Sequence, residues 1–179
     1  MNIVHMFKKK AFFTTVCLIF CFVVASCGYH RAERSAELPS WIKSIYIVPW
    51  QNRSNELLLA AWITDELRQE FLRGSSLSLA AKEDADVILE GQVKEVATSG
   101  LSYVRHDQAI ERRIDVVCTA TLKDRRTGEI IWTTADIVRE ESFLVGKEAT
   151  ETEALKNKAL KKLSRDVAEL IYHRIGGVF

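Results

Sequence analysis

The stretch RIDVVCTATLK, residues 113–123, decides the fold of this chain. Its apolar positions alternate with mainly polar ones, and they are Ile114, Val116, Cys118, Ala120 and Leu122. This two-residue period predicts a strand with one face in the core and the other largely in water. Because Cys118 falls on the apolar face, we expect a packed, inert thiol rather than a reactive one.

The segments on either side of this strand also carry β-type patterns. ADVILEGQVKEVA, residues 85–97, predicts a strand before it, and residues 98–111 read as a polar loop. After it, DRRTGE (residues 124–129) is a short polar connection in which Gly128 is well placed for a positive φ. IIWTTADIVRE, residues 130–140, then resumes β-type residues, so the three strands form an antiparallel meander.

Further from the centre, the chain predicts two more strands and two helices. SIYIVPW (residues 44–50) is a buried strand that Pro49 ends, and LSLA (residues 77–80) is a short strand. A helix is predicted within residues 56–74, with an apolar stripe formed by Leu57, Ala60, Ala61, Thr64, Leu67 and Phe71. The last segment predicts a second helix, which Thr150 opens in a capping-box pattern with Glu153.

This element order predicts a two-layer α/β (α+β) sandwich. Each helix has one face to bury, so both pack on one face of a four-stranded mixed, mainly antiparallel sheet. The other face of the sheet stays polar to mixed and uncovered, and together with an edge strand it is a natural docking surface. The length of 179 residues and the 47% hydrophobic content fit a single domain with a real core.

The N-terminal segment has the layout of a secretory signal peptide. Lys8, Lys9 and Lys10 precede an acid-free apolar segment, residues 11–25, which ends in small residues. The apolar segment is near the lower limit for crossing a bilayer, so a retained membrane anchor stays open as an alternative.

The tetrapeptide Val24-Ala25-Ser26-Cys27 resembles the lipobox of bacterial lipoproteins. The resemblance implies cleavage before Cys27 and a covalent lipid on that cysteine. We therefore expect residues 1–26 to be a removed signal peptide, residues 27–40 a lipidated tether and residues 41–179 a single domain. Gly28 follows the cysteine, and in lipoproteins of Gram-negative bacteria a residue other than Asp there favours the outer membrane.

The other cysteines need no disulfide on this interpretation. Cys17 and Cys21 are apolar filler of the discarded segment, and Cys118 is then left without a partner. We expect no internal disulfide, although the compartment is oxidising.

Charge and motif content exclude several functions. Only three of the 25 basic side chains precede Cys27, so 22 remain against 24 acidic ones and a nucleic-acid partner is not expected. His30, His106 and His173 are far apart, and no metal-ligand spacing, nucleophile motif or phosphate loop is found in the sequence. The acidic clusters read as surface charges. We expect no enzyme, no metal and no cofactor beyond the lipid on Cys27.

The predicted topology brings several basic residues to one end of the sheet. The loops at residues 98–111 and 141–150 meet there, whereas the turn at residues 124–128 lies at the other end. The basic group consists of Arg105, His106, Arg112, Arg113 and Lys147. Such a group can bind phosphate or sugar-acid groups. The alternative is that these residues simply decorate loops, since acidic neighbours partly cancel them.

Four segments together resemble one family. CGYH after the lipobox is followed by IVPWQNRS, ELRQEFLR and ADVILEGQV, in an order that resembles the LptE family of lipopolysaccharide-assembly lipoproteins from Cys27 to the last helix. Some of these motifs also occur in other envelope lipoproteins whose domains resemble the curli-secretion and TolB N-terminal folds. An envelope adaptor or secretion-channel lipoprotein is therefore the alternative.

The resemblance implies a specific role. Members of the family are non-catalytic lipoproteins, lipid-anchored at the periplasmic face of the outer membrane. They plug the lumen of the LptD β-barrel, assist its assembly and bind lipopolysaccharide. Their fold places two helices on a four-stranded sheet. Basic residues near one tip are implicated in lipopolysaccharide binding, and Arg105, Arg112 and Lys147 are the candidates here, although no local motif matches.

Overall fold

The computed structural model describes residues 39–74, 77–105 and 108–176. The predicted signal peptide, Cys27 and most of the tether lie outside the described residues. The elements are β1 (Ser44–Ile47), β2 (Gln51–Asn52), α2 (Leu59–Gly74), β3 (Ser78–Leu79), β4 (Val87–Arg105), β5 (Gln108–Asp124), β6 (Ile130–Thr133), β7 (Ile137–Leu144) and α3 (Ala149–Gly176).

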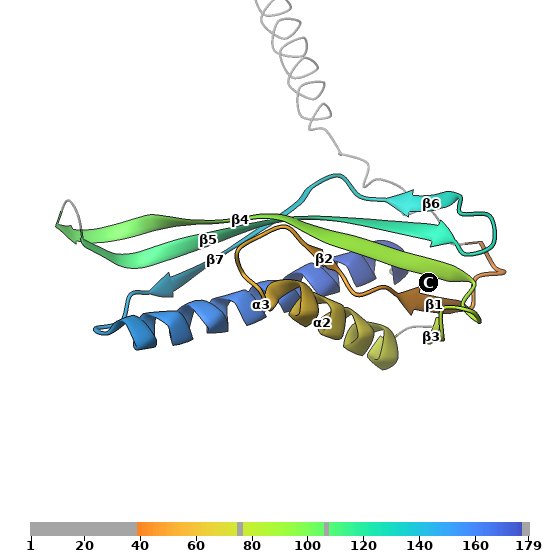
Figure 1. Cartoon of the computed structure of the whole chain (residues 1–179), viewed down its shortest axis with the longest axis horizontal. Helices are drawn as coiled ribbons and strands as arrows, with labels where there is room; N and C mark the ends of the chain where they lie inside the picture. Colours follow the sequence, from red (N-terminus) through yellow and green to blue (C-terminus); the bar gives the residue numbers. More distant parts are fainter. Residues whose placement is uncertain (1–38, 75–76, 106–107, 177–179) are drawn as a thin grey trace, which may run out of the picture. The chain divides into compact units, whose positions relative to one another are not determined.

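The elements form two layers, with α2 and α3 on one face of a single sheet (Figure 1). The predicted two-layer α+β class is confirmed. The sheet order is β3-β1-β4-β5-β6, with β2 also pairing with β4 and β7 with β5. The β1 pairs with β3 and β4 are parallel and the pairs made by β5 are antiparallel, so the sheet is mixed and mainly antiparallel.

The predicted count of four strands is wrong, because the described residues form seven. The predicted strand at residues 130–140 is split into β6 and β7, which lie one after the other along the same side of β5. The short β2 and β3 add pairs with β4 and β1. β3 lies within the predicted short strand at residues 77–80, so that prediction is confirmed. β2 was not predicted, because a strand of two residues is too short to show an alternation.

The predicted polar loop at residues 98–111 is also wrong. β4 and β5 pair from Val87 opposite Asp124 to Arg105 opposite Gln108, so most of this segment belongs to one long hairpin. The turn at the other end of β5, which leads to β6, is as predicted, since Gly128 has a φ of 74°. The Asp124 carboxylate accepts the backbone N–H groups of Arg126 and Thr127, at 2.7 and 3.1 Å, and these bonds lower its pKa.

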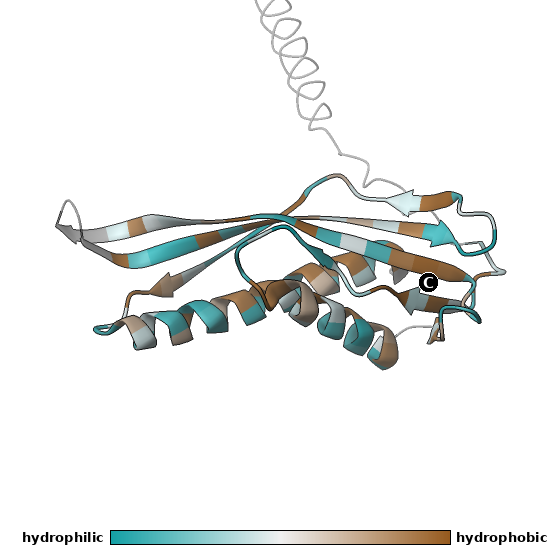
Figure 2. Ribbon diagram, viewed as in Figure 1, coloured by the Kyte–Doolittle hydropathy of each residue, from teal (hydrophilic) through white to brown (hydrophobic). Residues whose placement is uncertain are grey.

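The core lies between the sheet and the helices. The apolar face of β5 is buried as the alternation predicted, and the hydrophobic stretches of β1 and β4 lie over the helices (Figure 2). Cys118 is a buried free thiol, and burial raises its pKa to about 12. The prediction of a packed, inert cysteine is confirmed, since almost no thiolate forms at neutral pH.

Gly91 in β4 is fixed by a close approach of Trp50. A Cβ at this position would lie 2.0 Å from Cε2 of the indole, so no side chain fits. Trp50 is in turn held through its backbone N–H, which donates to the buried hydroxyl of Thr64 at 3.0 Å. Together they join the segment after β1 to the middle of β4 and to α2.

Helix α3 begins at Ala149, and its first turn differs from the predicted capping box. Thr152 and Glu151 reach back to accept the N–H groups of Gly146 and Lys147, at 3.0 and 2.8 Å. Glu153 instead pairs with Lys156 at 2.9 Å. The Thr150–Glu153 box is therefore wrong, because the helix starts two residues earlier than a cap at Thr150 requires and other side chains satisfy its first turn. Of the helices in the described residues, none combines the length and apolar content needed to cross a membrane.

Candidate functional site

The hairpin formed by β4 and β5 extends past the end of β7 at one end of the sheet (Figure 1). The pairing of β7 with β5 stops at Leu144 opposite Glu111, and Val145 adds one backbone bond to Ile110. Beyond this point, β4 and β5 pair with no other strand of the described residues. We call residues 101–105 and 108–110 the arm.

All three predicted basic residues lie at the arm end of the sheet. Arg105 ends β4 near the tip, and Arg112 lies at the base, opposite Gly100. At about 3.3 Å per residue, the two levels are about 13 Å apart along the hairpin. Lys147 follows the end of β7, so it also lies near the base. The topology thus brings Arg112 and Lys147 to one region and Arg105 to another.

Arg112 and Lys147 have exposed side chains, and no ion pair of either occurs within the described part of the chain. Arg112 shares its face with Ile114 and lies opposite Phe143, on the side of the sheet that carries the helices. An unpaired guanidinium can hold a phosphate or carboxylate with two parallel hydrogen bonds. The base of the arm therefore offers two cations to an anionic ligand.

Arg113 differs from its neighbour because it points to the opposite face. Its guanidinium contacts Asp115 at 3.3 Å and Glu140 at 3.6 Å. These acidic partners already neutralise it. His106, the remaining member of the predicted basic group, lies outside the described residues.

The second candidate surface is the sheet face opposite the helices, which no described element covers (Figure 1). Its side chains pair with one another across the strands: Lys123 with Glu90, Lys94 with Asp136 at 2.8 Å, and Thr121 with Thr133 at 3.2 Å. The predicted polar, uncovered face is therefore present, and its side chains are held in place.

Catalytic groups are hard to assemble from these residues. Among residues 39–74, 77–105 and 108–176 there is no cluster of three metal-ligating side chains. The carboxylates with shifted pKa values, Asp86 and Asp124, are shifted downward by backbone hydrogen bonds, which favours the charged form over a proton-donating acid.

The sequence pattern placed one exposed residue in the core. Leu57 was predicted to begin the core stripe of the first helix, but it precedes α2 and is 86% exposed. Ala61 is also exposed, and the buried residues of α2 are Leu59, Ala60, Ile63, Thr64, Leu67 and Phe71. The run Leu57-Leu58-Leu59 is the signal that could have revealed this, because three consecutive leucines cannot all face one core.

Comparisons with known proteins agree with this fold. The model of the family described as LptE, lipopolysaccharide-assembly, matches residues 42–175. The chain has no match among curated protein sequences.

Three solved structures show the same fold. Lipoprotein B from Nitrosomonas europaea is 16% identical with a TM-score of 0.55, covering 84% of this chain and 91% of that one. A lipoprotein from Caulobacter crescentus is 12% identical with a TM-score of 0.53, covering 73% and 86%. The PelC dodecamer from Paraburkholderia phytofirmans is 14% identical with a TM-score of 0.50, covering 75% and 89%. At these identities the likeness concerns the fold alone.

Proposed function

The chain belongs to the LptE family of lipopolysaccharide assembly, and on this premise we propose that it is a non-catalytic plug and assembly partner of the LptD β-barrel. The observation that carries the proposal is the extent of the family match. Residues 42–175 include every strand that the structure describes, the whole of α2 and all of α3 except its last residue, so the folded unit is of the family type.

The uncovered sheet face supports a role inside a barrel. A plug must present polar groups to a lumen that is itself polar, and it must keep its shape there. The cross-strand pairs of Lys94 with Asp136 and of Thr121 with Thr133 provide both properties. This face is the surface that we assign to the barrel wall.

Lipidation of Cys27 would hold the domain at the periplasmic face of the outer membrane. A single acyl chain gives marginal binding, whereas several chains give a stable anchor. The tether of residues 27–40 then raises the concentration of the domain beside its barrel. Mass spectrometry of the mature N-terminus tests this step, because an unmodified Cys27 or a retained leader contradicts it.

We assign contact with lipopolysaccharide to the positively charged residues where the arm joins the sheet. Arg112 and Lys147 are exposed there without acidic partners among the described residues, and Arg105 lies farther along the same hairpin. The phosphate and sugar-acid groups of lipopolysaccharide are the anions that Arg binds with two hydrogen bonds. This is a non-covalent transfer role and needs no nucleophile.

The lipid-binding step is tested with Arg105→Glu combined with Lys147→Glu, and separately with Arg112→Glu. Loss of charged hydrogen bonds is expected to weaken lipopolysaccharide binding about tenfold or more. The matched control is Lys82→Glu with Arg126→Glu, which changes the same charge at the opposite end of the sheet. Unchanged binding by the first set removes these residues from the site.

Pull-down of the full-length lipidated protein in mild detergent tests the central proposal. A large outer-membrane β-barrel, identified by mass spectrometry as LptD, is the expected partner. The barrel should be lost or reduced for Cys27→Ala, which removes the lipid but not the domain. A stable homo-oligomer without any barrel would instead indicate the envelope adaptor or secretion-channel function.

A further inference from the structure

Two leucine side chains directly before α2 are exposed to solvent. Leu57 is 86% exposed and Leu58 is 58% exposed, the loop between β2 and α2 carrying both. Single exposed apolar residues are common on protein surfaces, so exposure alone says little. The loop that carries these two is unusual because it is tied down at both ends.

Side chains within the loop hold its backbone. The Asn52 amide donates to the carbonyl oxygen of Glu56 at 2.8 Å, and its oxygen accepts the N–H of Ser54 at 2.9 Å. The Ser54 hydroxyl accepts the N–H of Glu56 at 3.2 Å. These are the side-chain turns that Asn and Ser form with nearby backbone, and here they fix the residues directly before Leu57.

An ion pair joins the same loop to α3. The Lys156 ammonium lies 3.1 Å from Glu56 and 2.9 Å from Glu153, with only 21% of the lysine side chain exposed. Burial alone would lower the pKa of Lys156, but the hydrogen bonds to Glu153 and Glu56 outweigh it and raise the pKa. The lysine is therefore charged at neutral pH and holds the loop against the helix.

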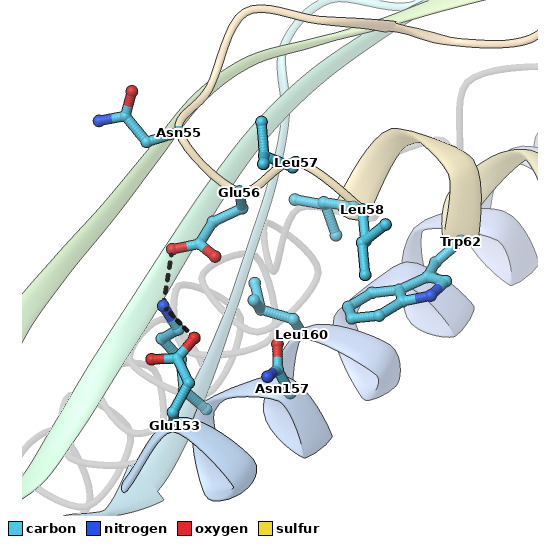
Figure 3. Close-up of a pocket in the computed structure, with 10 residues that line it drawn as sticks. Asn55, Glu56, Leu57, Leu58, Trp62, Glu153, Asn157 and Leu160 are labelled. Carbon is cyan, nitrogen blue, oxygen red and sulfur yellow. Dashed lines mark hydrogen bonds and ion pairs between the residues drawn. The ribbon is translucent and has the colours of Figure 1, made fainter. Parts of the chain in front are cut away.

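The fixed loop borders an open cleft of about 500 Å³ between the start of α2 and α3. Figure 3 shows Leu58 and Trp62 on the α2 side, Leu160 and Asn157 on the α3 side, and Leu57 at the rim. The Glu56 and Glu153 carboxylates lie at one end, on either side of Lys156. We call this feature the Leu57 cleft.

The fixed loop and the Leu57 cleft match the centre of a protein interface better than they match a loop that only connects two elements. Binding energy concentrates on a few apolar residues in a pocket, and it is larger when those residues are already ordered before binding. A connecting loop gains nothing from two exposed leucines. A rigid loop that presents them beside Trp62 has the properties of a preformed docking point.

The charges around the cleft decide which kind of ligand fits. Two carboxylates and one ammonium leave one end of the cleft negative, whereas Lys161 lies 5.4 Å from the Trp62 ring centre. An anionic lipid headgroup would be repelled at the carboxylate end, and Glu153 is exposed enough to accept a cation. The Asn157 amide offers a donor and an acceptor, which match a peptide backbone.

We propose that the Leu57 cleft binds a polypeptide segment that inserts an apolar side chain between Leu58, Trp62 and Leu160 and places a lysine or arginine at Glu153. Resting on the proposed function, this inference assigns the segment to the barrel partner. It adds a second contact region, on the helix layer, to the sheet face that meets the barrel wall.

Photo-crosslinking in cells tests the occupant directly. The full-length chain carries p-benzoylphenylalanine at Leu57, and the matched control carries it at Leu72, which is 72% exposed near the C-terminal end of α2. After irradiation, the adduct at position 57 is expected to contain the barrel protein, identified by mass spectrometry, with at least tenfold less at position 72. An adduct with a second copy of this chain, an adduct with lipid, or equal yields at both positions would overturn the inference.

Binding variants separate this inference from the proposed function. Leu57→Ser is expected to reduce the barrel recovered in mild detergent about tenfold, as for a central interface residue, and Leu72→Ser to leave it unchanged. Glu153→Lys should weaken recovery further, with Glu169→Lys in the same helix as the charge control. Thermal unfolding of each purified variant shows whether the fold is intact.

The outcomes are distinguishable. If the wild-type chain recovers the barrel and Leu57→Ser recovers it equally well, the cleft is not part of the interface and the plug function stands. If the wild-type chain recovers no barrel, both proposals fail.

Discussion

The two halves of the β4–β5 hairpin are both antiparallel strand pairs, but their surroundings are very different. In the half over the helices, Val87, Leu89 and Leu122 are completely buried. In the arm, Leu101 and Ile110 are 49% and 42% exposed. The alternation that identifies a strand in sequence therefore comes from burial of one face and not from pairing itself. A strand without a covering layer has no reason to alternate.

The register of the hairpin shows the same contrast. From Val87 to Val93 the pairing with β5 is continuous, whereas four shifts follow, three of them beyond Gly100. Moving a register by one residue exchanges the faces of every side chain, which is forbidden where one face is in the core. The two apolar side chains described in the arm, Leu101 and Ile110, are exposed, so the core does not fix the register there. Bulges also protect an exposed edge from pairing with other chains.

Truncating a core leucine should separate the two halves most clearly. Leu122→Ala removes a fully buried side chain from the covered half and is expected to lower the free energy of unfolding by about 2–5 kcal/mol. Leu101→Ala in the arm should change it by less than about 0.5 kcal/mol. Urea denaturation of the two variants measures the difference, and similar losses would show that the arm is packed after all.

A pair of glycine substitutions gives the next largest effect. Gly91→Ala places a methyl group 2.0 Å from the Trp50 ring, and overpacking of this kind costs about 1–3 kcal/mol or more. Gly100→Ala, in an exposed position opposite Arg112, should be nearly neutral. Equal destabilisation in denaturant titrations would contradict the assignment of Gly91 to a close approach.

Acid should weaken the covered half through Asp86. Its carboxylate accepts the N–H of Lys43 at 2.9 Å and the N–H and hydroxyl of Ser44 at 3.0 Å, and these bonds lower its pKa, with the Lys43 bond first. A lowered pKa means that the stabilisation is present above the unfolded value of about 3.9 and is lost as the pH falls through the folded value.

Asp86→Asn is therefore expected to cost about 1–2 kcal/mol at neutral pH and to flatten the loss of stability below about pH 4. Unfolding free energies measured from pH 7 to pH 3 check this. Glu111→Gln at the base of the arm is the control, because its carboxylate accepts no hydrogen bond from the described residues. An unchanged acid profile in Asp86→Asn would show that other carboxylates carry the effect.

The sequence predicted the parts of the fold in which burial of one face gives a regular spacing of apolar residues. The alternation around Cys118, the turn at Gly128 and the two-helix layer were all predicted correctly, because each depends on neighbours close in sequence or on one buried face. The arm was missed because exposed pairing leaves no pattern. The break between β6 and β7 was missed because both segments have the same β-type residues, and only pairing with β5 separates them.

The candidate sites follow the same division. Topology from the sequence placed Lys147 and Arg112 at one end of the sheet, but not the face of each side chain, so Arg113 was grouped with residues on the opposite face. The Leu57 cleft was missed because a helical period assigned Leu57 to the core. Its exposure depends on where α2 starts, which Asn52, Ser54 and Lys156 determine through bonds that no local pattern reveals.

Removing the arm is expected to have the smallest effect on stability. Gly100 and Arg112 lie directly opposite each other, so an Asn-Gly turn replacing residues 101–111 closes the hairpin in the geometry of a two-residue loop. The deletion loses the pair of Glu111 with Leu144 and the bond from the Val145 N–H to Ile110. Leu101 and Ile110 are exposed and contribute little to the core, so the cost should stay near about 1 kcal/mol. Thermal unfolding and lipopolysaccharide binding are measured on the same variant.

Because Arg112 and Lys147 remain, binding that survives the deletion would place the site for anionic groups at the base of the arm, whereas binding that disappears would place it on the arm with Arg105. A large loss of stability would instead mean that the uncovered half supports the covered one, and the contrast between the two halves would no longer hold.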